Sequence, residues 1–146
     1  MNWEHGQQDL ELLEYFKYVI KIRKKLINIF NPSFFPSKQT NENNPTYHWH
    51  GTKLDSPDWS SWSHTVAFSI NKGINNPLVW IGLNAYSKSI DFSLPKCKYN
   101  WLKVVDTSMS KIFKPLTINE KSVSIKSRSS LLMISEEVFG TKNNIL

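Results

Sequence analysis

The apolar residues of this chain change their period once, and this change separates a helical part from a strand-rich part. Between residues 7 and 29 they recur at spacings of three, four and seven, which is typical of an amphipathic helix. From Thr46 onward the period is two, which is typical of strands with one buried face. The helical stripe comprises Leu12, Leu13, Phe16, Val19, Ile20, Leu26, Ile27 and Phe30. The sequence therefore predicts one long N-terminal helix followed by a β-rich domain.

Charged residues and a proline support the predicted helix. Glu14 lies one turn before Lys17, a spacing at which opposite charges attract each other on a helix. Asn31-Pro32 ends the pattern, because the residue before a proline disfavours helical geometry. Arg23 falls inside the apolar stripe, where an unpaired guanidinium would be costly to bury. We interpret Arg23 as a snorkelling or structurally paired arginine, with direct substrate contact as the alternative.

Seven segments after the helix have the length and composition of short strands: 46–50, 65–70, 78–83, 89–94, 101–106, 121–125 and 130–134. Residues 78–81 are apolar throughout, which indicates a central strand, and Trp80 and Trp101 are predicted core residues. Turn-forming residues separate most of these segments. The predicted fold class is mainly β, an antiparallel β-sandwich of about seven short strands preceded by one long amphipathic α-helix.

Length and composition are those of one soluble domain. The 146 residues are 40% hydrophobic, which is ample for a core. No apolar stretch of about eighteen residues could span a bilayer, and the N-terminus lacks the basic start and apolar run of a signal peptide. Cys97 is the single cysteine and cannot form an intramolecular disulfide, which fits a reducing compartment. We expect a soluble, cytoplasmic chain with no membrane partner.

The net charge of +6 leaves a second class of function open. A basic chain can bind phosphate backbones, and Tyr86, Tyr99 or Trp101 could stack on bases in a single-stranded nucleic-acid-binding β-barrel protein. The lysines are scattered through turns and strand ends, whereas a nucleic-acid footprint needs clustering on one face. We therefore expect solvated lysines and no nucleic acid, and keep this function as the alternative.

Three motifs follow one another in the middle of the chain: Trp49-His50-Gly51, Pro57-Asp58-Trp59-Ser60 and Val66-Ala67-Phe68-Ser69. At this spacing they resemble the C-terminal portion of isoamylase-type glycogen and starch debranching enzymes of the α-amylase superfamily. Further landmarks that resemble this family are Ile22-Arg23-Lys24, Leu83-Asn84-Ala85, Ser93-Leu94-Pro95, Val105-Asp106-Thr107 and Arg128-Ser129-Ser130-Leu131. The resemblance covers nearly the whole chain.

The resemblance implies three parts and a function. Residues 1–30 would be the last helix of a truncated catalytic barrel, residues 31–64 a connecting loop with a short strand and the Trp/His segment, and residues 65–146 the C-terminal β-sandwich domain. The family's catalytic carboxylates lie on barrel strands that would precede Met1, so no catalytic residue is expected here. The implied function is that of an accessory and stabilising segment of an α-1,6-glucosidase, inactive alone. Its partners would be an α-glucan and the missing barrel, in the cytoplasm or in the plastid stroma of a plant.

Five residues near the first two motifs are candidate glucan contacts: Trp62, Trp59, Trp49, His50 and Asp58. Sugar rings stack their C–H faces on indole while their hydroxyl groups need polar partners, and this segment offers both. The alternative is that Trp49 and Trp59 fill the seam between barrel and β-domain, whereas the polar neighbours of Trp62 indicate exposure. Asp58, preceded by Pro57, is expected to fix a turn through its side chain.

Metal binding and other catalytic chemistry are not indicated by the remaining residues. His48 and His50 are two apart on a predicted strand and therefore share a face, but no spacing signature supplies a third ligand. No Gly-x-Ser-x-Gly motif is present for a serine nucleophile. We expect neither a metal nor a cofactor. The helix face Leu12, Phe16, Val19 and Ile27 is expected to be incompletely covered and to favour self-association.

Overall fold

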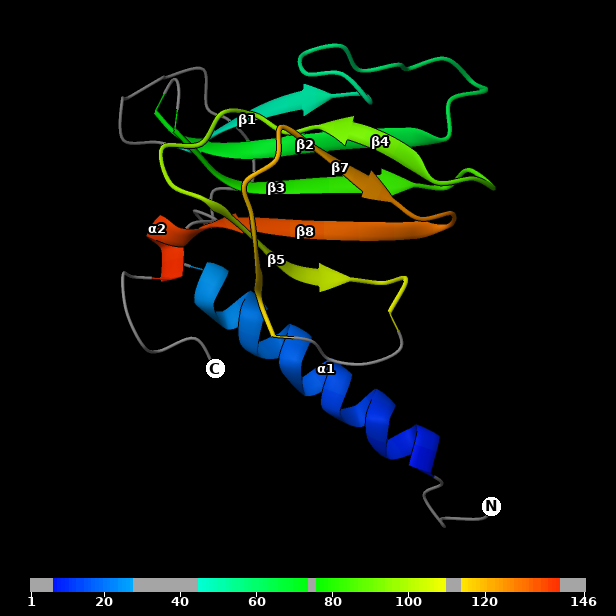
Figure 1. The fold of residues 1–146 in the computed structure, drawn as a ribbon, viewed down its shortest axis with the longest axis vertical. Coiled ribbons are helices and arrows are strands. Elements are labelled where there is room, and N and C mark those ends of the chain that lie inside the picture. The colour runs from blue at the N-terminus through cyan, green and yellow to red at the C-terminus, as the bar shows by residue number, and fades with distance from the viewer. Residues whose placement is uncertain (1–6, 28–44, 74–75, 110–113, 140–146) are drawn as a thin grey trace.

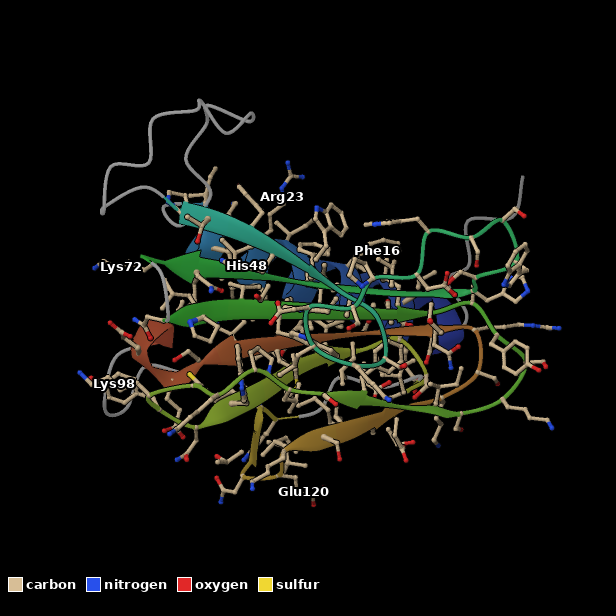
Figure 2. The ribbon with its side chains drawn as sticks, turned by 90° about the horizontal axis from the view of Figure 1, so that it is seen from above. Phe16, Arg23, His48, Lys72, Lys98 and Glu120 are labelled. Atoms are coloured by element: carbon tan, nitrogen blue, oxygen red, sulfur yellow. The ribbon has the colours of Figure 1, made fainter. Side chains whose placement is uncertain are left out.

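The fold, seen in a computed structural model that describes residues 7–27, 45–73, 76–109 and 114–139, has three layers (Figure 1). Helix α1 (Gln7–Leu26) packs on one face of a six-stranded antiparallel sheet, and a two-stranded sheet covers the other face. In the view of Figure 2, Glu120 lies on one side of the large sheet, and Phe16 and Arg23 of α1 lie on the other. The predicted linker up to residue 44 and the tail from residue 140 lie outside the described residues.

The chain leaves the large sheet twice to build the small sheet. The large sheet contains, in spatial order, β1 (Pro45–His50), β2 (Thr65–Lys72), β3 (Pro77–Asn84), β8 (Ser129–Ser135), β5 (Trp101–Asp106) and β6 (Leu116–Ile118). The small sheet pairs β4 (Ile90–Ser93) with β7 (Ser122–Ile125), and a short helix, α2 (Glu136–Phe139), follows β8. The predicted helix and all seven predicted strands are confirmed. The sequence prediction missed β6 and α2, which are too short to show a hydrophobic period.

The two faces of β3 build the two halves of the core, because successive side chains of a strand point to opposite faces. Val79 faces α1 together with Ile134 of β8, and Trp80 faces β4 and β7 together with Met133. All four side chains are fully buried. Gly82 leaves room on the Trp80 side, since a Cβ atom there would collide with the Trp80 ring and with Ile125. The predictions of residues 78–81 as a central strand and of Trp80 and Trp101 as core residues are confirmed.

Helix α1 packs on the sheet with a narrower face than the apolar stripe of the sequence indicates. Tyr18, Ile22 and Leu26 are buried against the sheet, and the hydroxyl of Tyr18 donates a hydrogen bond to the carbonyl oxygen of Val104 over 2.7 Å. Most of the predicted stripe points to solvent: Leu12, Leu13, Phe16, Ile20 and Ile27 are exposed, and Val19 is partly buried. The helix is therefore apolar on two sides.

Two details of α1 follow from this orientation. The predicted contact between Glu14 and Lys17 is present, with 2.7 Å between Lys17 Nζ and Glu14 Oε1. Arg23 is exposed on the solvent side of the helix, so its guanidinium needs no buried acceptor (Figure 2). Neither of the two described helices combines the length and the apolarity that a membrane span requires.

Candidate functional site

The loop of residues 51–64, which joins β1 to β2, carries most of the predicted site residues (Figure 1). It is tied down at both ends: the backbone N–H of Ser93 donates to the Thr52 carbonyl over 2.9 Å, and that of Ala85 donates to the His64 carbonyl over 2.8 Å. Gly51 is buried where the loop folds back, and a Cβ atom on it would collide with the carbonyl oxygen of Ser56. These contacts give the loop a defined conformation.

His50 holds the first half of this loop from inside the protein. Its Nδ1 accepts a hydrogen bond from the backbone N–H of Asp55 over 3.0 Å, and its Nε2 lies 3.1 Å from Ser69 Oγ. Because Nδ1 accepts an N–H, the imidazole is neutral and carries its proton on Nε2, which donates to Ser69. Asp55 adopts a left-handed backbone conformation, with φ 53°, to make this contact.

Burial and charge act in opposite directions on His50. Burial lowers its pKa, and the nearby Asp55 carboxylate, whose Oδ1 lies 3.3 Å from Nδ1, raises it. The net pKa lies below the usual value because desolvation is the larger effect and His48 adds to it. The close approach of Asp55 Oδ1 is therefore a contact with a neutral ring and not an ion pair at neutral pH. His50 therefore stabilises the conformation of the first half of the loop through these hydrogen bonds.

Aromatic side chains gather where the loop returns to the sheet. Trp49 packs edge-on against Trp59, with ring centroids 5.3 Å apart, and also against Phe68 at 5.3 Å. Trp49 and Trp59 remain 49% and 66% exposed, and Trp62 is 76% exposed. The expected exposure of Trp62 is confirmed. We call Trp49, Trp59 and Phe68 the aromatic step; it lies on the same face of the large sheet as α1.

Asp58 shapes the turn that contains Trp59. Its Oδ1 accepts hydrogen bonds from the backbone N–H of Ser60 over 3.0 Å and from the Ser60 hydroxyl over 2.7 Å. These bonds lower the pKa of the Asp58 carboxyl below its usual value. The predicted turn is confirmed, and the carboxylate is occupied in holding it.

The five candidate glucan contacts do not form one site in the structure. Trp49 and His50 are neighbours on β1 and so point to opposite faces of the sheet. Trp59 joins Trp49 in the aromatic step, and the Asp58 carboxylate is bonded within its own turn. Trp62 stands exposed at the turn that ends the loop. A sugar could therefore meet tryptophans on the α1 side of the sheet or His50 on the other side, but not both at once.

The histidine pair and the aromatic residues of the alternative function also have defined places. His48 and His50 share a face of β1, as predicted, yet the described residues contain no cluster of three or more metal-ligating side chains. Trp101 is buried and its indole N–H donates to the Pro95 carbonyl over 3.0 Å, so the prediction that it could stack on bases is wrong. Tyr86 is exposed and stacks on His64 with ring centroids 6.0 Å apart.

A polar pocket on the face opposite α1 was missed by the sequence prediction. It has a volume of about 420 Å³ and lies where the 51–64 loop and the segment after β4 approach β1 and β2. Its buried lining includes His50, Ser69 and Asn71. A signal for it exists in the sequence: His48, His50, Ser69 and Asn71 are polar at the alternate positions that should face the core.

Comparisons with known proteins agree with this geometry. The sequence matches the family described as Isoamylase 1-3, C-terminal, over residues 48–140, which run from β1 to the end of α2. No curated protein matches the chain. The matched region covers the 51–64 loop with its tryptophans, β2 to β8 and the polar pocket. This chain belongs to the family of isoamylase 1–3 C-terminal domains.

Proposed function

We propose that this chain is an accessory and stabilising segment of a glycogen or starch debranching enzyme, an α-1,6-glucosidase of the isoamylase type. In this proposal the catalytic carboxylates reside on a separate barrel that docks against the chain, and the chain alone has no glycosidase activity. The observation that carries the proposal is the second apolar side of α1, which the chain's own sheet leaves uncovered.

The exposed side of α1 is the kind of surface that a second body covers. Leu12, Phe16 and Ile27 are 55%, 57% and 61% exposed. Ile22, on the other side of the helix, is buried in the core. A helix that is apolar on two sides is typically buried between two packed layers. An exposed apolar surface of this kind marks a site of protein association.

The aromatic step extends this docking surface onto the sheet. Trp49 pairs in register with Phe68, and Phe68 packs at the edge of the core that α1 covers. The step therefore lies on the face of the molecule that carries α1, and it leaves Trp49 about half exposed and Trp59 about two-thirds exposed. We assign Trp49 and Trp59 to the seam with the barrel and Trp62, the most exposed of the three, to contact with α-glucan.

The test uses an isoamylase catalytic barrel freed of its own C-terminal domain. We expect this chain to bind the barrel and raise its melting temperature, and Leu12→Glu with Phe16→Lys to abolish both effects. The matched control is the charge exchange Glu14→Lys with Lys17→Glu, which alters an exposed ion pair on the same helix and should bind like the wild type. If wild-type chain neither binds nor stabilises the barrel, the proposal is wrong.

Activity provides a separate check. Purified chain incubated with glycogen or amylopectin should release no reducing ends, because glycoside hydrolysis needs two carboxyl groups placed on either side of the scissile bond. The barrel alone serves as the positive control. Release of reducing ends by the chain itself would assign catalysis to residues within it.

A further inference from the structure

The polar pocket between β1 and β2 contains a buried acceptor without a donor. Asn71 is only 7% exposed, and its Oδ1 has no hydrogen-bond partner among the described residues. Most buried polar atoms in proteins form a hydrogen bond. A buried acceptor without a donor in a pocket therefore indicates a binding position for water or for a ligand that donates a hydrogen bond. Asn71 lies beside Ser69, which is likewise buried and lines the same pocket.

The hydrogen bonds around the pocket fix what the other buried groups can offer. His50 Nε2 donates to Ser69 Oγ, which leaves the Ser69 hydroxyl hydrogen available to an incoming acceptor. Thr46 Oγ1 donates to the carbonyl of Gly73 over 3.3 Å, so the His48 Nε2 atom, 3.3 Å from Thr46 Oγ1, donates to it. In a neutral His48 ring, Nδ1 is then an acceptor. Figure 2 marks His48 on β1.

The exposed part of the lining adds charge and apolar surface. The Asp55 carboxylate and the Lys96 ammonium lie at the exposed part, and the half-buried Pro95 and the buried Pro77 supply apolar surface deeper in the lining. The pocket thus offers acceptors at Asn71, His48 and Asp55 and donors at Ser69 and Lys96. A fully deprotonated anion such as sulfate would bring acceptors only, which cannot satisfy Asn71 Oδ1, and Asp55 would offset its attraction to Lys96. A hydroxyl group both donates and accepts, and a sugar adds C–H faces that suit proline.

We propose that this pocket binds a glucosyl unit of an α-glucan chain. The proposal rests on the proposed function for the identity of the sugar and adds a binding site to it, separate from Trp62. In this site the Asn71 side chain turns so that Oδ1, which is closed to solvent in the structure, accepts from one sugar hydroxyl, and a neighbouring oxygen accepts the Ser69 hydroxyl hydrogen. Lys96 and Asp55 bond further hydroxyl groups at the rim.

A second, larger hollow adjoins the pocket. It has a volume of about 740 Å³ and shares Leu54, Pro95 and Lys96 with the polar pocket. Tyr99 lines it and is 37% exposed, so that its ring can serve as a stacking surface. Glu120 and Lys121 provide polar groups in its lining. Adjoining hollows of this size suit a short malto-oligosaccharide, with one unit in the polar pocket and the next ones toward Tyr99.

The test is a titration of the ¹⁵N-labelled chain with maltotriose, followed by backbone amide chemical shifts. We expect saturable shifts of Asp55, Ser69 and Asn71, with a dissociation constant in the millimolar range. Asn71→Leu replaces the orphan acceptor by an apolar group of similar shape, so the fold should persist while affinity falls about tenfold or more. Lys96→Ala, at an exposed position, should also weaken binding. Lys88→Ala, exposed but outside the pocket, is the matched control.

The remaining outcomes each overturn the proposal. Shifts confined to the surroundings of Trp62, and lost in Trp62→Ala, would place the sugar on the loop instead. Saturable shifts of Ser69 and Asn71 with inorganic phosphate but not with maltotriose would make the pocket an anion site. If no amide shifts change up to tens of millimolar maltotriose, the pocket does not bind the sugar and holds water only. None of these outcomes affects binding to the barrel, so the two proposals fail separately.

Discussion

Two neighbouring residues decide the path of the 51–64 loop. His50 accepts the Asp55 N–H, and Gly51 lets the chain pass directly against the Ser56 carbonyl. The sequence predicted the turn at Asp58, because that interaction is local and its residue types are typical of turns. It could not predict the role of His50, since the second partner, Ser69, lies nineteen residues away and is brought near only by strand pairing. Local contacts were predictable here and long-range ones were not.

Gly51→Ala should destabilise the protein by about 1–3 kcal/mol, because the new methyl group meets backbone, which cannot move aside as a flexible side chain can. Urea unfolding followed by tryptophan fluorescence measures the loss. Ser61→Ala, exposed in the same loop, is the control and should change the free energy of unfolding by less than about 0.5 kcal/mol. An unchanged Gly51→Ala stability would mean that the loop can shift its path.

His50 should make the stability of the protein depend on pH. Its pKa is lowered in the folded state, so the unfolded chain binds a proton more readily than the folded one. The stabilisation is fully present above about pH 6.5, the ordinary value for histidine. It is lost progressively as the pH falls from there through the folded pKa.

The free energy of unfolding, measured by urea titration at several values between pH 7.5 and 5.5, checks this dependence. The wild type should lose stability on acidification in this range, and His50→Gln should show a smaller slope even if it is less stable throughout. His64→Gln, which removes an exposed imidazole, is the control. Equal slopes for wild type and His50→Gln would assign the pH dependence to other groups.

At the scale of elements, helix α1 shows which features of a helix hydrophobic periodicity can predict and which it cannot. The period predicted the helix, and α1 (Gln7–Leu26) is present. It did not predict the packed face, because the helix is apolar on two sides and the pattern holds no information on which side meets the sheet. Tyr18 and Ile22 make that contact, and a tyrosine was not counted in the apolar stripe. The strands were easier to predict, because a period of two, or in β3 a short run of apolar residues, can be recognised within a few residues.

The assignment of the two sides of α1 can be tested by truncation. Ile22→Ala should lower the free energy of unfolding by about 2–4 kcal/mol, since it leaves a cavity against the sheet. Tyr18→Phe should cost about 1 kcal/mol through loss of the hydrogen bond to Val104. Phe16→Ala, on the exposed side, should change stability by less than about 0.5 kcal/mol. A reversed order of Ile22→Ala and Phe16→Ala would place the other side of the helix on the sheet.

For the whole molecule, the antiparallel β-sandwich beside one helix followed from the change of hydrophobic period. The order of the strands did not, because β8 inserts between β3 and β5 and its pairing joins segments about fifty residues apart in the chain. The polar pocket depends on the same long-range pairing, since it forms only when β1 lies beside β2 and the segment after β4 crosses them. The uncovered side of α1 was expected from the family resemblance, in which a barrel would cover it, and not from the hydrophobic period.

The outer side of α1 should make the chain self-associate when no barrel is present. Leu12, Phe16 and Ile20 form an exposed apolar surface on successive turns, and a second copy can cover it. Sedimentation velocity over a range of protein concentrations should show association of the wild type that increases with concentration. Leu12→Glu with Phe16→Lys should sediment as a monomer, because burying either charge in the contact would be costly. Lys21→Glu, an exposed charge reversal on the same helix, controls for charge alone. A wild-type monomer at all concentrations would show that this apolar side does not drive self-association.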